Sequence, residues 1–327
     1  MIQTRTLAAL EPDQRSAIAA LAGAVERLDG AEPLNEAALL RLANTGPRLR
    51  HLVAEDAGVL RGYAQLDRPG GTLDDAEGTV DGSGRRPATA EVLVGPQARP
   101  QTALALLTAA EAAAADAAAA EAAATAALLV WSRGHSPVGA VASERGYVER
   151  RVMEVMSRPL AGLADLSVDV PAGFTIRPFR VGADEKAWLA VNARAFAGHP
   201  EQGAWTEVDL EQRQEQDWFD PAGFLLAEDT DGHLLGYHWT KVHAAVGTGQ
   251  PPVAEVYVLG IDPDGQGRGL GRALLGAGLR HLAAASGAQQ VILYLEENNG
   301  TAAALYRSAG FAVTRRDVRL LGPADAG

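Results

Sequence analysis

The 327-residue sequence contains no cysteine. Disulfides, thiolate metal sites and a cysteine acyl-enzyme intermediate are therefore excluded. The seven histidines form no His-x-His or His-x-x-x-His pair, so we expect no metal site. Any group transfer must then use another nucleophile or pass directly to the acceptor.

The sequence also lacks an excess of basic residues and a long apolar run. The formal net charge is −12, which argues against a nucleic-acid partner because phosphate recognition needs a clustered basic surface. The most apolar tract, Ala109 to Leu128, is interrupted by Glu111, Asp116 and Glu121, so we read it as an alanine-rich surface helix. The first residues lack the apolar run of a signal peptide. We therefore expect no membrane partner and a cytoplasmic location.

Two parts of the sequence repeat each other. His51–Asp67 and Phe224–Lys241 both read as an apolar strand that runs into Ala-Glu-Asp, a turn, and Gly-Tyr on a second strand, which is a hairpin pattern. Further repeated blocks follow in the same order. Two pairs of residues share an offset of 164 positions, which argues for an internal duplication: Glu91 with Glu255, and Gly146 with Gly310.

Each half reads as a helix, three strands, a helix, a strand, a helix and a strand, with opening helices at Glu11–Leu28 and Asp184–Phe196. Interleaving of this kind predicts an α/β fold with a mixed, mostly antiparallel sheet flanked by helices. Pro159 and Pro171 bracket the connection between the halves. We therefore expect domains at residues 1–158 and 172–327.

Glycines alternate through the segment that follows the strand at Glu255. Gly265, Gly267, Gly269 and Gly271 precede a helix predicted from Arg272. Glycines allow close approach of the backbone, and free amides at a helix start favour phosphate oxygens. The Walker and dinucleotide patterns both fail, because the Gly-Lys-Ser/Thr and the correctly spaced third glycine are absent. A flexible, glycine-rich helix entry without a ligand is the structural alternative.

Two motifs carry a resemblance to a known superfamily. Gln266–Gly271 resembles the pyrophosphate loop of the GCN5-related N-acetyltransferases (GNAT), and Asn298–Phe311 resembles the second signature of that superfamily. The internal repeat extends the pattern, so the resemblance implies two tandem GNAT domains. Four further segments are similar to the mycothiol synthase family: His199–Gly203, Trp218–Pro221, Gly236–His243 and Glu255–Gly260.

This resemblance implies an acetyl-CoA-dependent N-acetyltransferase. Mycothiol synthases acetylate the cysteinyl amine of 1-D-myo-inositol-2-(L-cysteinylamino)-glucopyranoside, so the expected acceptor is a small thiol-sugar with a primary amine. Direct transfer in a ternary complex, by a monomer, is the expected route. Two alternatives stay open: a tandem GNAT enzyme that acts on another amine, such as an aminoglycoside or a protein N-terminus, and a non-catalytic acyl-CoA sensor.

The resemblance also assigns roles to residues. Glu255 is the expected base and Tyr306 the expected acid, against the alternatives of a strand-end carboxylate and a packing tyrosine. Contacts to the cofactor are expected from Leu259, Gly260, Ile261, Gln266, Gly267, Arg268, Gly269, Leu270, Gly271, Arg272, Asn299, Gly300, Thr301, Ala302, Ala303 and Ala304. A basic residue is expected at the position of Ala304, and only Arg307 is nearby. Contacts to the acceptor are expected from Glu36, Glu201, Lys241, Glu255 and Tyr294, which places the acceptor between the domains.

The first half departs from this pattern. Its loop reads Gln97-Ala98-Arg99-Pro100, so both glycines are missing and Pro100 removes an amide donor. Ala142 stands in place of Tyr306. We predict a degenerate phosphate loop and a catalytically silent domain, in which Val92, Leu93 and Val94 still pair with a pantetheine arm. The segment Arg68–Pro87 reads as a flexible insertion.

Overall fold

The computed structural model describes residues 1–29, 31–67, 86–120, 124–245 and 251–323 of the chain, which divides into two compact units. Of these residues, the first unit holds those up to 153 and those from 315 onward, and the second holds 154–314. The predicted flexible insertion lies almost entirely outside the described residues. The predicted α/β fold with helices flanking a mixed sheet is confirmed in both units.

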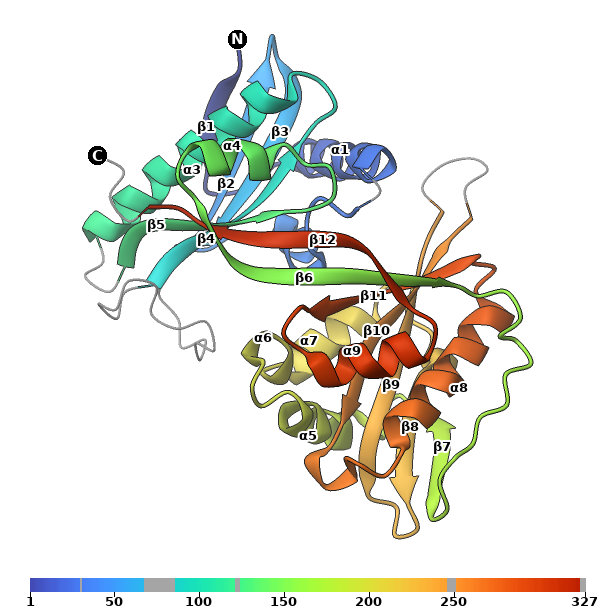
Figure 1. The fold of residues 1–327 in the computed structure, drawn as a ribbon. Helices are drawn as coiled ribbons and strands as arrows, with labels where there is room; N and C mark the ends of the chain where they lie inside the picture. Colours follow the sequence, from blue (N-terminus) through green and yellow to red (C-terminus); the bar gives the residue numbers. More distant parts are fainter. Residues whose placement is uncertain (30, 68–85, 121–123, 246–250, 324–327) are drawn as a thin grey trace. The chain divides into compact units, whose positions relative to one another are not determined.

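The first unit is built on the strand order β1-β2-β3-β4-β5 (Figure 1). All neighbours are antiparallel except β4 and β5, which are parallel. Alternating residues point to opposite faces, so Leu52 and Ala64 pack against α3 whereas Val53 and Tyr63 pack against α1. The elements are β1 (Gln3–Leu7), α1 (Pro12–Asp29), α2 (Glu36–Leu40), η1 (Arg41–Ala43), β2 (Leu49–Asp56), β3 (Val59–Asp67), β4 (Arg86–Val94), α3 (Arg99–Ala120), β5 (Ala124–Ser132), α4 (Val138–Glu144) and the first part of β6 (Val148–Pro159). The residues of β6 from Glu154 onward belong to the second unit.

The second unit repeats this plan with the strand order β7-β8-β9-β10-β11. Residues of α8 and α9 form one cluster with the sheet, and α5 and α7 pack on the other face around Trp188 and Trp239. The elements are β7 (Phe174–Pro178), α5 (Glu185–Ala195), α6 (Pro200–Gly203), α7 (Glu207–Gln214), η2 (Pro221–Gly223), β8 (Phe224–Asp229), β9 (Leu234–His243), β10 (Val253–Ile261), η3 (Pro263–Gly265), α8 (Leu270–Ala285), β11 (Gln290–Glu296), α9 (Gly300–Ser308) and β12 (Ala312–Leu321).

The last strand does not stay with the second half of the sequence. Residues of β12 from Arg315 onward belong to the first unit, where Val318–Leu321 pair antiparallel with β5. The expected range 172–327 therefore differs from the observed units at its C-terminal end. The difference arises because strand pairing, which a linear repeat does not report, decides where β12 lies. Strand β1 also lacks a sequence signal, because its polar, mostly exposed residues show no apolar alternation.

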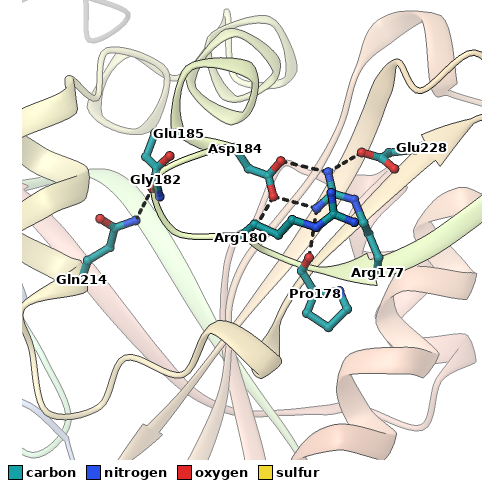
Figure 2. A network of polar contacts seen from close by, with 8 residues as sticks. All are labelled: Arg177, Pro178, Arg180, Gly182, Asp184, Glu185, Gln214 and Glu228. Atoms are coloured by element: carbon teal, nitrogen blue, oxygen red, sulfur yellow. Dashed lines mark hydrogen bonds and ion pairs between the residues drawn. The ribbon is translucent and has the colours of Figure 1, made fainter.

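An ion-pair network joins three elements of the second unit (Figure 2). The guanidinium of Arg177 on β7 donates to both carboxylate oxygens of Asp184, at 2.6 and 2.9 Å, and to Glu228 on β8. The backbone amide of Arg180 also donates to Asp184, at 2.7 Å. Burial acts to raise the pKa of Asp184, but the bonds from Arg177 and Arg180 outweigh it and the net pKa is lowered. The network fixes the start of α5 against the sheet.

Replacing Arg177→Met should lower the free energy of unfolding at neutral pH by roughly 3 kcal/mol, because two part-buried carboxylates lose their partner. The pKa of Asp184 is depressed in the folded state, so its contribution is present above the unfolded value of 3.8 and is lost as the pH falls through the lower folded value. The difference in unfolding free energy between the wild-type protein and Arg177→Met should therefore become smaller below pH 3.8. Urea unfolding at several pH values measures this difference.

The matched control is Arg180→Met, since that exposed side chain leaves the backbone bond to Asp184 intact. An equal loss of stability in both variants would contradict the assignment of this role to Arg177.

Candidate active site

Strand β10 carries the predicted base, Glu255. The strand pairs antiparallel with β9, with a bulge at Tyr257 that shifts the register. On its other side it pairs in parallel with β11 at only two positions, Ala254 with Val291 and Glu255 with Ile292. The two strands therefore stop pairing directly after Glu255.

Beyond Glu255, the edge of β10 that faces β11 has no strand partner among the described residues. Leu259, Gly260 and Ile261, the predicted contacts to the coenzyme arm, lie in this stretch. Backbone N–H and C=O groups on such an edge can pair with an extended ligand as they would with another strand. A β-carbon at Gly260 would lie 2.7 Å from the ring of Tyr237 and 3.0 Å from that of Phe196, so the packing requires glycine.

The glycine-rich loop follows β10 and opens α8. Gly267 and Gly269 have φ values of 72° and 84°, the left-handed region that favours glycine. Helix α8 begins after Gly269 with no side-chain cap, which leaves its first amides without an intrahelical partner. Gln266, Arg268 and Arg272 are exposed around this start. Leu270 is buried in the core, so only its backbone is available to a ligand.

Two polar contacts hold this loop in place. Nη2 of Arg194 on α5 lies 2.8 Å from Oδ1 of Asp262 and 2.5 Å from Oδ2 of Asp264. Asp262 in turn accepts a bond from the amide of Asp264 at 2.9 Å, which caps the short helix η3. The guanidinium of Arg268 lies over the ring of Phe174, at 4.4 Å from its centroid. The loop thus has a fixed entry and an exposed, amide-rich turn.

The start of α9 differs from that of α8, because the side chain of its own N-cap residue binds one of its first amides. The side chain of Asn299 accepts a bond from the amide of Ala302 at 3.1 Å. Ala303 is buried in the core, whereas Gly300, Thr301 and Ala304 are exposed. The nearby Arg307 has its Nη2 3.9 Å from Oε2 of Glu154.

The predicted base lies in a buried cluster of charged groups. Glu255 is 6% exposed, and its Oε2 lies 2.6 Å from Nε2 of His243. Lys241, the partner of Glu255 across β9 and β10, is 7% exposed. Its ammonium lies 4.7 Å from the ring centroid of Trp218 and 5.1 Å from that of Tyr257. Cations over aromatic faces are stabilised when desolvated, so this arrangement holds a positive charge beside the carboxylate.

A second buried cation completes this cluster. Arg213 on α7 is 7% exposed, donates from Nε to the hydroxyl of Tyr257 at 2.8 Å, and lies 3.9 Å over the ring of Trp205. The sequence assigns no role to His243, Tyr257 or Arg213. His243 and Tyr257 lie inside segments that carry the family resemblance, so that resemblance could have identified them as site residues. No sequence signal could have identified Arg213, because its position depends on how α7 packs.

The predicted acid, Tyr306, lies on α9 in the core. It is 7% exposed and packs with Val256, Leu293 and Phe311, with 5.8 Å between the ring centroids of Tyr306 and Phe311. No hydrogen bond to its hydroxyl is found within the described part of the chain. Burial raises the pKa of Tyr306 well above its ordinary value, so the hydroxyl keeps its proton at neutral pH.

Base and acid candidates lie on opposite faces of β10. Tyr257, two residues after Glu255, packs with the aromatic cluster of α5 and α7, whereas Tyr306 packs with Ala254 and Val256 beneath α8 and α9. Side chains alternate between faces along a strand, so only a break in the sheet lets both groups approach one ligand. The end of pairing after Glu255 is such a break.

The predicted acceptor residues are only partly brought together. Tyr294 on β11 shares a face with Ile292, the partner of Glu255, so Glu255, Lys241 and Tyr294 lie on one face of the second unit. Glu36 is part-buried at the start of α2 in the first unit. The side chain of Glu201 lies outside what the structure describes.

The equivalent position in the first unit has the same arrangement of strands but different neighbouring side chains. Glu91 is 5% exposed and forms an ion pair with Arg133, and it accepts a bond from Asn35 at 3.0 Å. Both its oxygens are therefore occupied by protein groups. Val92 and Val94 lie beyond Ala90, the last residue of β4 that pairs with β5, so their contact with a pantetheine arm stays a prediction.

The helix entry of the first unit offers fewer donors to an anion than that of α8. Ala98 takes the left-handed conformation, at φ 51°, that Gly269 takes before α8. Pro100 lacks an amide hydrogen in the first turn of α3. Nη2 of Arg99 is already 2.6 Å from Oδ2 of Asp29. The left-handed geometry of the helix entry is thus retained with fewer donors.

Two further features of the described residues concern a metal ion and a membrane as possible partners. Asp229, Asp231 and His233 can bring ligand atoms within 4.8 Å of one another at an exposed turn, where bonds from His233 and Asp231 to Asp229 already account for the grouping. No helix in the described ranges is long and apolar enough to cross a membrane.

Comparison with known proteins decides the family. A family model described as acetyltransferase (GNAT) family matches residues 189–311. The chain is 43% identical to the mycothiol acetyltransferase of Salinispora arenicola over 93% of this chain and 91% of that protein. It is 46% identical to that of Geodermatophilus obscurus, over 94% of each.

The chain belongs to the mycothiol acetyltransferase family. It is an N-acetyltransferase that uses acetyl-CoA as the acetyl donor.

Solved structures agree on the fold of this mycothiol acetyltransferase family member. A tandem GNAT protein from the clavulanic acid biosynthesis pathway matches all of both chains with a TM-score of 0.73 at 19% identity. A GCN5-related N-acetyltransferase from Sphaerobacter thermophilus matches with a TM-score of 0.64 at 23% identity, over 100% of this chain and 96% of that one. The predicted tandem GNAT fold is confirmed.

Proposed function

We propose that this chain acetylates the cysteinyl amine of 1-D-myo-inositol-2-(L-cysteinylamino)-glucopyranoside, and that acetyl-CoA and the acceptor are bound together when the transfer occurs. The observation that carries this proposal is the identity of 43–46% to mycothiol acetyltransferases along nearly the whole chain. The absence of cysteine supports direct transfer, because no thiol is available to hold the acetyl group.

The second unit fits acetyl-CoA. The open edge of β10 at Leu259–Ile261 would pair with the pantetheine arm, and the uncapped start of α8 would hold the pyrophosphate through amides from Gly267 to Arg272. Arg268 and Arg272 are exposed beside this start and would add charge-assisted bonds. The coenzyme supplies the activated acetyl thioester. Asn299 and residues 300–304 would contribute through the backbone at the start of α9.

The cluster around Glu255 fits an amine on a polyhydroxylated acceptor. Lys241, whose ammonium lies over the rings of Trp218 and Tyr257, carries donors that suit hydroxyl or carbonyl oxygens. By resemblance, Glu36, Glu201 and Tyr294 would add further contacts. Glu255 is the only one of these groups that we assign to proton removal.

The proposed reaction moves the acetyl group directly from the coenzyme sulfur to the acceptor nitrogen. Glu255 takes a proton from the acceptor ammonium, and the freed amine nitrogen attacks the thioester carbonyl carbon. The carbon–sulfur bond breaks with its electron pair on sulfur, and Tyr306 donates a proton to that sulfur. Tyr306 is suited to this donation because it is protonated at neutral pH and its hydroxyl has no partner in the described residues. The second proton of the amine restores Tyr306 through solvent, so one proton is released overall.

We infer that the first unit is catalytically silent. Its carboxylate Glu91 is held by Arg133 and Asn35, and its helix start offers fewer donors because Pro100 lacks an amide hydrogen and Arg99 is paired with Asp29. Its role in this proposal is structural, since β5 supplies the pairing partner of β12.

The purified protein should convert the thiol-sugar amine and acetyl-CoA into an N-acetylated product. Mass spectrometry should show a gain of one acetyl group on the acceptor, and a thiol assay should show one free coenzyme thiol per product. Turnover of an aminoglycoside or a peptide N-terminus without turnover of the thiol-sugar would contradict the proposed acceptor. Coenzyme binding without turnover of any amine would point to a sensor.

Replacing Tyr306→Phe should reduce kcat by about 100-fold or more, the usual loss when a general acid is removed. The variant removes only the hydroxyl, which makes no protein hydrogen bond in the described residues, so the ring packing and the unfolding temperature should change little. An unchanged kcat would refute the acid role. A large fall in unfolding temperature would show that the hydroxyl has a structural partner.

Replacing Gly269→Ala should raise the KM for acetyl-CoA about tenfold, because the left-handed turn before α8 is strained and the amides no longer point to the pyrophosphate. The matched control is Gly287→Ala, which also has positive φ, at 66°, and an open space for a β-carbon. Both variants should lose about 1 kcal/mol of stability, but only the first should change KM. Equal KM values for acetyl-CoA in the two variants, measured by steady-state kinetics, would contradict a phosphate-binding role of the loop.

A further inference from the structure

The contact between Glu255 and His243 has no role in the mechanism above. Nε2 of His243 lies 2.6 Å from Oε2 of Glu255, and the two side chains are 13% and 8% exposed. His243 ends β9 and is paired with Val253, two residues before Glu255, so both side chains lie on the same face of the sheet. The other oxygen, Oε1, has no hydrogen-bond partner within the residues that the structure describes.

A buried carboxyl group must be ionised to accept a proton. Burial alone favours the neutral acid, whereas a hydrogen bond donated to the carboxylate favours the ionised form. A bond to one oxygen also fixes the rotation of the carboxylate plane. In this site, the bond at Oε2 leaves the lone pairs of Oε1 for an acceptor ammonium.

We propose that His243 is the positioning residue of Glu255: its imidazole donates from Nε2 to Oε2, keeps the carboxylate ionised and directs Oε1 to the acceptor amine. This inference rests on the proposed function, in which Glu255 is the base. It assigns to His243 no contact with the acceptor or with the coenzyme.

Other charged and titratable groups also face Glu255, and the experiment has to distinguish their effects on the pH profile from the effect of His243. From β9 the neighbour is Lys241, and from β10 it is Tyr257, which Arg213 of α7 binds. From β11 the groups on this face are Tyr294 and Glu296, whose Oε1 lies 3.6 Å from Nδ1 of His199. None of these is changed in the variants below, so their contribution stays constant.

The test is the pH dependence of kcat/KM for the acceptor in the full chain with His243→Phe and His243→Gln. Phenylalanine keeps the ring volume and removes the donor to the carboxylate, so the rising limb of the profile should move up by about one pH unit. At pH values below the limb, kcat/KM for the acceptor should fall about tenfold. Glutamine retains a donor at a similar reach and should restore the position of the limb. The KM for acetyl-CoA should be unchanged in both, since His243 pairs with Val253, at the opposite end of β10 from the phosphate loop.

Two results would overturn the inference: a limb that does not move in His243→Phe, or a limb in His243→Gln that coincides with that of His243→Phe. If the phenylalanine variant does not fold, His243→Asn replaces it, because its side chain is too short to reach Oε2. Glu255→Gln separates this inference from the proposed function. Retained turnover in Glu255→Gln refutes the base assignment itself, whereas loss of turnover there with an unmoved limb in His243→Phe refutes only the role of His243.

Discussion

The structure depends on one local constraint, the end of pairing between β10 and β11 directly after Glu255. A parallel pair that continued would occupy the backbone of Leu259–Ile261 and separate the two faces of the sheet. Because pairing stops, the edge is open to an extended ligand, and a group on α9 and a group on β10 can approach that ligand from opposite faces. The left-handed glycines and the uncapped start of α8 lie at the end of the same strand.

The first unit shows that this framework does not suffice. It has the same parallel pair, the same left-handed helix entry and a glutamate at the equivalent position. There, Arg133 and Asn35 occupy the carboxylate, and Pro100 and the ion pair of Arg99 reduce the donors at the helix start. In the second unit, the carboxylate keeps a free oxygen among the described residues and the amides stay unpaired. The two units therefore differ in which polar groups already have a protein hydrogen-bond partner and which stay available to a ligand.

Charge near the base is controlled by aromatic packing. Lys241 and Arg213 are both nearly buried, and each lies over an aromatic ring near Tyr257. Burying two cations would be costly without such faces and without nearby acceptors. The cluster therefore holds positive charge beside Glu255.

The sequence by itself determined the duplication, the α/β class, the helices near Glu11–Leu28 and Asp184–Phe196, and the loop at Gln266–Gly271, because these depend on periodicity and on backbone chemistry at single positions. It also identified Glu255 and Tyr306 as residues of interest. Only the tertiary structure decided that β12 pairs with β5, that Arg213 and His243 lie beside the base, and that the two catalytic candidates lie on opposite faces of β10. Strand pairing and helix packing join residues far apart in the chain, and no local pattern encodes which partners will meet.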